Sequence, residues 1–197
     1  MALGKFLVNN KTLAFCLLLI LAFLAFLPEK KQGLKMQDLK AMPELEVLDL
    51  VLRAGVDLDS LLIRQISNSP YSHIGVVIST KPLQILHASS SDTKNKVAIS
   101  DFSYFLAHAK AIAIKRYENL ANKEQIINYL KAQVGKDFKL TNNKDALYCT
   151  TLIEKAFKQD LSLSYKNIDM SLLSGKYLFP KAFYDDNKSA LIYEFKP

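Results

Sequence analysis

A cysteine at the start of a predicted helix is the residue of this sequence best suited to chemistry. Downstream of Cys149, apolar residues recur at helical spacing, which predicts a helix with one face toward a core. These residues are Leu152, Ile153, Ala156 and Phe157. Free backbone N–H groups at such a helix start stabilise a thiolate, so we expect them to lower the pKa of Cys149 and to bind an oxyanion. The alternative is a small buried hydrophobic residue, as most free cysteines are.

Two histidines lie in a predicted β-hairpin upstream of the cysteine. Residues 71–78 and 83–88 read as two strands rich in β-branched residues, joined by a turn over residues 80–82. A turn about Thr80 would place His73 and His87 opposite each other, with Cβ atoms roughly 4.5–5.5 Å apart. One imidazole can then act as a base toward a thiol while the other orients it. The alternative is a pair of half-buried polar residues near a sheet edge.

Four segments together resemble the YiiX/YebB-like group of permuted NlpC-type cysteine hydrolases, papain-like proteins in which the histidine precedes the cysteine. The segments are residues 49–53, 69–77, 134–138 and 148–153, which read DLVLR, SPYSHIGVV, VGKDF and YCTTLI. The resemblance covers roughly residues 45 to 195. It implies a permuted papain-like fold with Cys149 as nucleophile and His73 as base. His87 matches the third polar position, which is acidic in some relatives, and Leu48 stands where a glycine is expected.

The N-terminal segment predicts export. Residues 13–27 form an uninterrupted apolar run preceded by Lys5 and Lys11, the layout of a signal peptide. The run is shorter than the roughly 17–25 residues of a usual spanning helix, and no clear cleavage site follows it. We expect residues 1–27 to be a signal peptide or an uncleaved membrane anchor that holds the protein in the periplasm or cell envelope. Cleavage and secretion are the alternative.

The remaining sequence predicts one α+β domain after a linker. Residues 28–43 read as the linker and residues 44–197 as the domain. Strands are expected at residues 45–53, 97–99, 111–117 and 189–195, and helices at residues 57–66 and 122–134. A polar run over residues 89–96 is expected to be an exposed loop. This order of elements predicts an antiparallel sheet with the Cys149 helix packed on one face.

Composition argues against several other kinds of site. The net charge is +7, but residues 1–40 contribute four of these charges, and no basic stripe with interleaved aromatics indicates nucleic-acid binding. The sequence has no CxxC, no paired histidines at metal-binding spacing and no glycine-rich phosphate loop. We therefore expect no metal, no cofactor and no nucleic-acid partner.

Three functions remain open from the sequence. The first is a thiol-dependent hydrolase of amide bonds, for which export makes cell-wall peptides the expected substrate. The second is an acyltransferase or lipid-ester hydrolase of the lecithin retinol acyltransferase type, which the permuted relatives also resemble. The third is a binding domain in which Cys149 is inert.

Overall fold

The computed structural model describes residues 33–161, 163–170 and 173–196. The predicted signal peptide or anchor, residues 1–27, lies outside the described residues. Within the described ranges, none of the helices combines the length and the apolar character that crossing a bilayer would require.

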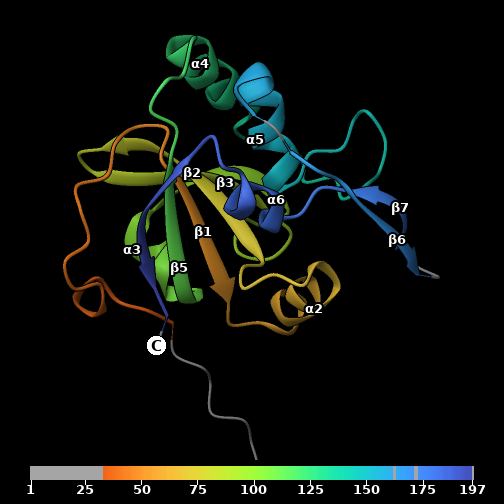
Figure 1. Cartoon of the computed structure of the whole chain (residues 1–197), viewed down its shortest axis with the longest axis horizontal. Helices are drawn as coiled ribbons and strands as arrows, with labels where there is room; N and C mark the ends of the chain where they lie inside the picture. The colour runs from red at the N-terminus through yellow and green to blue at the C-terminus, as the bar shows by residue number, and fades with distance from the viewer. Residues whose placement is uncertain (1–32, 162, 171–172, 197) are drawn as a thin grey trace, which may run out of the picture. The chain divides into compact units, whose positions relative to one another are not determined.

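A six-stranded antiparallel sheet forms the centre of the domain (Figure 1). Its strands are β1 (Leu50–Gly55), β2 (His73–Thr80), β3 (Leu83–Ser89), β4 (Lys96–Asp101), β5 (Ala109–Arg116) and β8 (Ala190–Phe195). They lie in the order β4-β3-β2-β1-β5-β8, and each pair of neighbours is antiparallel. The predicted α+β class with an antiparallel sheet is confirmed.

The helices and a second small sheet surround this sheet. The helices are α2 (Leu58–Ser67), α3 (Phe102–Ala107), α4 (Lys123–Gln133), α5 (Cys149–Phe157) and α6 (Pro180–Asp185), with short 3-10 turns at Met36–Asp38 and Lys158–Asp160. The strands β6 (Lys166–Met170) and β7 (Leu173–Tyr177) pair with each other. Helix α5 packs against α4 and over β2 and β3, so the helix that begins with Cys149 covers one face of the sheet as predicted.

Both faces of the sheet are buried, which explains why the inner strands read as continuous apolar runs. In β1, Leu50 and Leu52 belong to the core beneath α4 and α5, whereas Val51 points into a second core beneath α3. Neighbouring residues of a strand point to opposite faces, so each strand supplies both cores. The pairing of β1 with β2 and β5 is therefore held by two hydrophobic layers.

The described part of the predicted linker packs against the domain instead of spanning free space. Leu34 and Leu39 are buried in the core beneath α3, and the backbone N–H of Leu34 donates to the carbonyl of Ala109 at 2.8 Å. Burial of these two leucines stabilises the segment by roughly 1.5–3 kcal/mol each relative to exposure. These contacts hold the described part of the predicted linker against the domain.

Candidate active site

Cys149 is the first residue of α5, and its neighbours hold the start of that helix in place. The backbone N–H of Tyr148 donates to Thr151 Oγ1 at 3.0 Å, which satisfies a donor just outside the helix. Thr150 Oγ1 donates to the carbonyl of Leu178 at 2.9 Å, and the N–H of Leu178 donates to the Tyr148 hydroxyl at 3.1 Å. These bonds join the helix start to the segment before α6, so the backbone at Cys149 is fixed from two sides.

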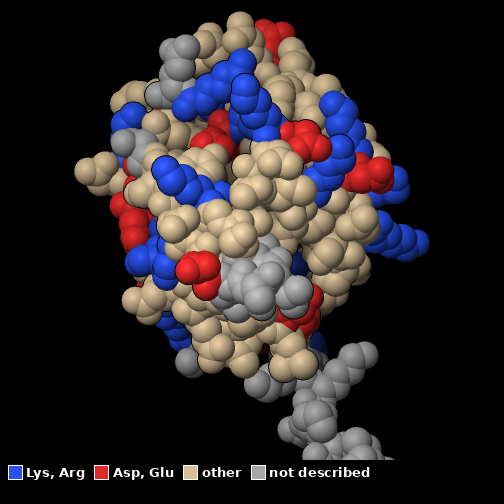
Figure 2. Space-filling model, turned by 90° about the vertical axis from the view of Figure 1, so that its right-hand side faces the viewer, with Lys and Arg blue, Asp and Glu red and all other residues tan. Residues whose placement is uncertain are grey.

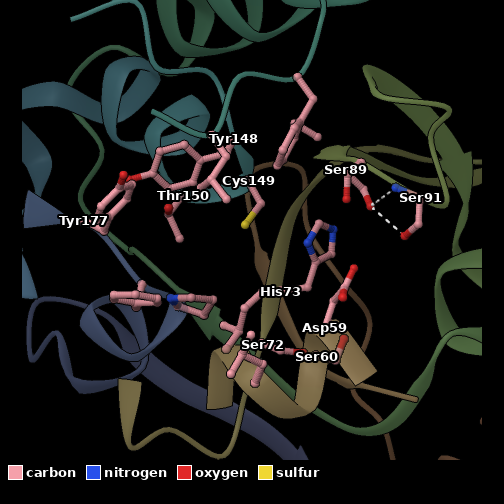
Figure 3. A pocket seen from close by; sticks show the side chains of 18 of the residues that line it. Asp59, Ser60, Ser72, His73, Ser89, Ser91, Tyr148, Cys149, Thr150 and Tyr177 are labelled. Atoms are coloured by element: carbon pink, nitrogen blue, oxygen red, sulfur yellow. Dashed lines mark hydrogen bonds between the residues drawn. The ribbon is translucent and has the colours of Figure 1, made fainter. Parts of the chain in front are cut away.

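The thiol of Cys149 lies in the same cavity as the imidazole of His73. Both residues line a cavity of about 350 Å³, and Figure 3 shows the sulfur and the imidazole on the same open space. His73 is the first residue of β2, and hydrogen bonds from the N–H groups of Ile74 and Thr150 reach the thiol. The structure thus brings together two residues that are 76 positions apart in the chain.

His87 contacts His73, but through a different register from the predicted one. Val76 pairs with Leu86, so the turn lies at residues 81–82 and continuing this register places His87 beside Gly75. A Cβ at Gly75 would lie 3.2 Å from the Cβ of His87 and 2.4 Å from a methyl carbon of Ile85, so only glycine leaves room here. The two imidazoles approach diagonally, with His73 Nε2 and His87 Nδ1 3.0 Å apart.

A serine on the next strand completes this chain of hydrogen bonds. His87 Nε2 lies 2.9 Å from Ser100 Oγ of β4. If the Nε2–H of His87 donates to Ser100, His87 Nδ1 is left as an acceptor for the Nε2–H of His73. His73 Nδ1 then carries a free lone pair, which is the state that a general base requires.

An aspartate and an arginine, neither of them proposed from the sequence, lie beside the histidines. Asp92 Oδ2 is 3.9 Å from His87 Nδ1 and accepts a 2.6 Å hydrogen bond from Arg53. Arg53 pairs with His73 across β1 and β2, donates to the carbonyl of Phe105 and stacks over that ring at 4.4 Å. Both members of the Arg53–Asp92 pair are almost fully buried. Asp92 belongs to the polar run that was expected to be an exposed loop.

Burial keeps both imidazoles neutral. It lowers the pKa of His87 to about 4, with Arg53 acting in the same direction and Asp92 in the opposite one. For His73, burial followed by the positive charge of Arg53 holds the pKa well below its usual value of 6.5. Burial raises the pKa of Asp92, but its surroundings, led by the positive charge of Arg53, lower the pKa by more, so this carboxylate stays ionised.

The thiol does not have the lowered pKa that the helix start predicted. Burial raises the pKa of Cys149 to about 11, and the N–H groups of Ile74 and Thr150 oppose this only in part. Moving the thiolate out of water costs more free energy than the two amide N–H groups restore by stabilising it. The resting pair is therefore a neutral thiol beside a neutral imidazole.

The cavity has two contrasting walls. One, here called the sheet wall, includes Arg53, Ser72, His73 and Ser89. The other, here called the helix wall, is mainly apolar and is formed by Leu62, Ile63 and Ile66 of α2 with Phe138, Leu140, Tyr148 and Tyr177. Asp57 and Asp59 lie at the edge where α2 begins. A ligand in this cavity meets hydrogen-bonding groups on one side and hydrocarbon on the other.

His73, His87 and Asp92 also form a group that can be tested for metal binding. Their ligand atoms lie within 4.8 Å of one another. However, Arg53 donates to the same Asp92 oxygen that lies nearest His87, and the two imidazoles hydrogen-bond to each other. A divalent cation would lie beside a guanidinium and would break both bonds. The arrangement does not fit a resident metal.

Comparison with known proteins identifies the family. The model of the permuted papain-like amidases, family C92, named for YaeF and YiiX, matches residues 56–192. The chain belongs to this family. Its members are papain-like amidases, so the chain is of the cysteine amidase kind, which agrees with the cysteine and histidine found in one cavity.

A solved structure has the same fold. The crystal structure titled metalloprotein YiiX from Escherichia coli O157:H7 matches with a TM-score of 0.67 at 16% sequence identity, over 79% of this chain and 100% of that one. The predicted permuted papain-like fold is thereby confirmed. Among curated proteins, none matches the chain.

Proposed function

We propose that this protein hydrolyses amide bonds through Cys149, with His73 as general base. The observation that carries the proposal is the hydrogen-bonded series from Ser100 through His87 to His73, which ends in the cavity that holds the thiol. His73 uses Nε2 to contact His87, so its Nδ1 is the nitrogen available to the thiol proton. Membership of an amidase family gives the bond type.

Because the Cys149 thiol and the His73 imidazole are both neutral before substrate binds, the first chemical step includes a proton transfer between them. As the Cys149 sulfur attacks the amide carbon, the thiol proton moves to His73 Nδ1 and the carbonyl oxygen becomes an oxyanion. Backbone N–H groups at the start of α5 can donate to that oxyanion, a contribution of roughly 3–4 kcal/mol per donor in other enzymes. His73 then passes the proton to the leaving amine, and water hydrolyses the thioester with His73 again as base.

Asp92 and His87 stabilise the charge that this step creates. Protonation of His73 produces an imidazolium among buried groups, which is unfavourable unless a negative charge lies nearby. Asp92 supplies that charge 3.9 Å from His87 Nδ1, while His87 accepts the hydrogen bond from His73 Nε2. His87 is therefore a positioning residue and Asp92 an electrostatic one.

For the substrate, we propose a peptide-like amide, with cell-wall peptides as the first class to test. The sheet wall offers hydrogen-bonding partners to a peptide backbone, and Asp57 and Asp59 at the edge suit a positively charged amino group. The predicted N-terminal signal peptide or anchor would place the domain in the periplasm or cell envelope, where such peptides occur. These features support the substrate class through chemistry and location.

A second candidate function is acyl transfer or hydrolysis of a lipid ester, as in the lecithin retinol acyltransferase type. The apolar helix wall favours it, because hydrocarbon side chains such as Leu62, Ile63 and Leu140 match an aliphatic acyl chain. The same thiol and imidazole would serve this chemistry. The two candidates differ in the product, which is an amine in the first case and a fatty acid in the second.

The test begins from a Cys16→Ser background, in which Cys149 is the remaining thiol of the chain. Purified protein is incubated with cell-wall peptides and, separately, with phospholipids, and new amines and released fatty acids are measured. We expect new amines, and a loss of about a thousandfold or more for Cys149→Ala and His73→Ala. The matched control is His108→Ala, because His108 does not line the cavity.

Three results would count against the proposal. Release of fatty acids without new amines would favour the lipid alternative. An activity that survives Cys149→Ala would exclude the thiol mechanism. If neither cell-wall peptides nor phospholipids are consumed by the protein with Cys149 intact, the inert binding domain is favoured.

A further inference from the structure

Helix α2 exposes a stripe of leucines. Leu58 is 83% exposed, Leu61 43% and Leu62 50%. Their spacing of three and four residues places them on one face of the helix. In this article the leucine stripe means these three residues. Adjacent large apolar side chains that keep this much exposed area within the described domain mark a surface suited to contact with another apolar phase.

The leucine stripe lies at the end of the domain where the chain enters it. Gly55, the last residue of β1, pairs with Ala109, and the carbonyl of Ala109 accepts the N–H of Leu34. Helix α2 starts three residues after Gly55. Leu34 and the start of α2 therefore lie at the same end of the sheet, which is the lower end in Figure 1.

The length of chain before Gly33 limits how far this end can be from a membrane. The apolar run predicted as signal peptide or anchor ends at residue 27, and residues 28–33 are six residues. Six extended residues span at most about 20 Å. A bilayer that holds residues 13–27 would therefore lie within that distance of the domain end that carries the leucine stripe.

Charge on and around α2 favours hydrocarbon over phosphate as the contact. The helix and its N-terminal flank carry Asp57, Asp59 and Arg64, so they lack the basic cluster that anionic head groups attract. In Figure 2 the lower part of the visible face, at the height of α2, is mainly neither acidic nor basic, whereas lysines and arginines gather higher up. This combination suits insertion of side chains between lipids, with little dependence on lipid charge.

We propose that the leucine stripe of α2 inserts into the surface of a lipid bilayer and brings the mouth of the cavity to the membrane. Leu62 belongs both to the stripe and to the helix wall, so the inserted face continues into the cavity. The membrane contact is independent of the proposed reaction, because it requires neither Cys149 nor His73. Its consequence is that substrates attached to the membrane reach the cavity directly.

The absence of tryptophan from the sequence allows a direct test. Leu58→Trp places the one tryptophan of the chain on the stripe, and Val134→Trp places it after α4, at the opposite end in Figure 1. Val134 is 44% exposed, which makes it a matched control for an exposed apolar position. The full-length chain is reconstituted into phosphatidylcholine vesicles with and without brominated acyl chains, and tryptophan emission is recorded.

We expect the Leu58→Trp emission to shift to shorter wavelength in vesicles and to fall at least about twofold with brominated chains, while Val134→Trp does neither. Raising salt or adding phosphatidylglycerol should leave the quenching unchanged. Equal quenching of both variants, or of neither, overturns the proposal. A blue-shifted Leu58→Trp emission without vesicles that grows with protein concentration also overturns it, because a second copy of the chain then covers the stripe.

Discussion

The two walls of the cavity differ in what their side chains contact. On the sheet side, Arg53 and His73 are buried, Arg53 donates to Asp92, and His73 bonds to His87 behind the wall. On the helix side, Leu62 and Leu140 are about half exposed. Groups that hold and move protons need fixed tautomers and a low dielectric, whereas groups that meet a substrate must stay uncovered. We therefore expect the sheet wall to carry out the chemistry and the helix wall to bind the substrate.

Among the residues that support His73 from behind the sheet wall, the largest effect should come from His87. Replacing it by alanine removes the acceptor for the Nε2–H of His73 and should lower kcat/KM by about a hundredfold. His87→Asn keeps an amide oxygen that can accept the same hydrogen bond, as the asparagine of papain-like enzymes does, and should retain most of the activity. Steady-state kinetics on both variants measure the effect. Equal losses in both would mean that His87 does not act by accepting this bond.

The next effect is on stability at low pH. The pKa of His87 falls from 6.5 in the unfolded chain to about 4 in the folded protein, so the unfolded state binds more protons between these values. The stabilisation from neutral burial is complete above pH 6.5 and is lost as the pH falls toward 4, by about 3 kcal/mol. His73 and ionised Asp92 change stability in the same direction.

Denaturant unfolding at pH values from 7.5 to 4 measures this loss. The control is His87→Asn, which removes one of the buried imidazoles and should reduce the dependence of the free energy of unfolding on pH. A wild-type protein and variant with identical pH dependence would show that His87 is not held neutral by the fold.

A smaller effect is expected on the helix wall. Leu62→Ser and Leu140→Ser should raise KM several-fold and leave kcat nearly unchanged, because these side chains bind substrate and transition state alike. Both positions are about half exposed, so little stability is lost. Leu191→Ser is the control, since Leu191 is 47% exposed on β8 and does not line the cavity. A fall in kcat with constant KM would place this wall in the reaction itself.

The smallest expected effect is that of metal removal. Because Arg53 holds Asp92 and the two imidazoles hold each other, treatment with EDTA should leave kcat/KM unchanged. An activity that is lost with the chelator and restored by Zn²⁺ would assign His73, His87 and Asp92 to a metal and refute the thiol mechanism in its present form.

Much of the fold could be predicted because the buried strands and helices have strong periodic patterns. The helix start at Cys149, the His73 hairpin and the antiparallel sheet all follow from local pattern. The pairing register of β2 with β3 did not follow from local pattern. The turn lies at residues 81–82, and the bulge between Val77 and Ser79 shifts the pairing in a way that residue spacing does not reveal. His73 and His87 contact each other because their side chains approach diagonally past Gly75, and not through the predicted direct pairing.

The parts that escaped prediction are those decided by distant contacts. Asp92 lies in a polar run, and its burial depends on Arg53, 39 residues earlier in the chain. The β6 and β7 strands are short, and Ile168 and Tyr177 of this hairpin pack in one cluster with Tyr148. Likewise α4 begins at Lys123, one residue after the predicted start, and the side chain of Asn122 makes no capping hydrogen bond. Local propensity carries no information about such partners.

The raised pKa of Cys149 also affects how the thiol withstands an oxidising environment. Oxidants and disulfides react with thiolates far faster than with thiols, and a pKa of about 11 leaves almost no thiolate at neutral pH. In the mechanism that we propose, the sulfur acquires its nucleophilic form only during substrate attack, when His73 takes the proton. A sulfur kept inert between turnovers resists sulfenic acid formation without a reducing partner, which suits an unpaired cysteine in the compartment that we predict for this chain.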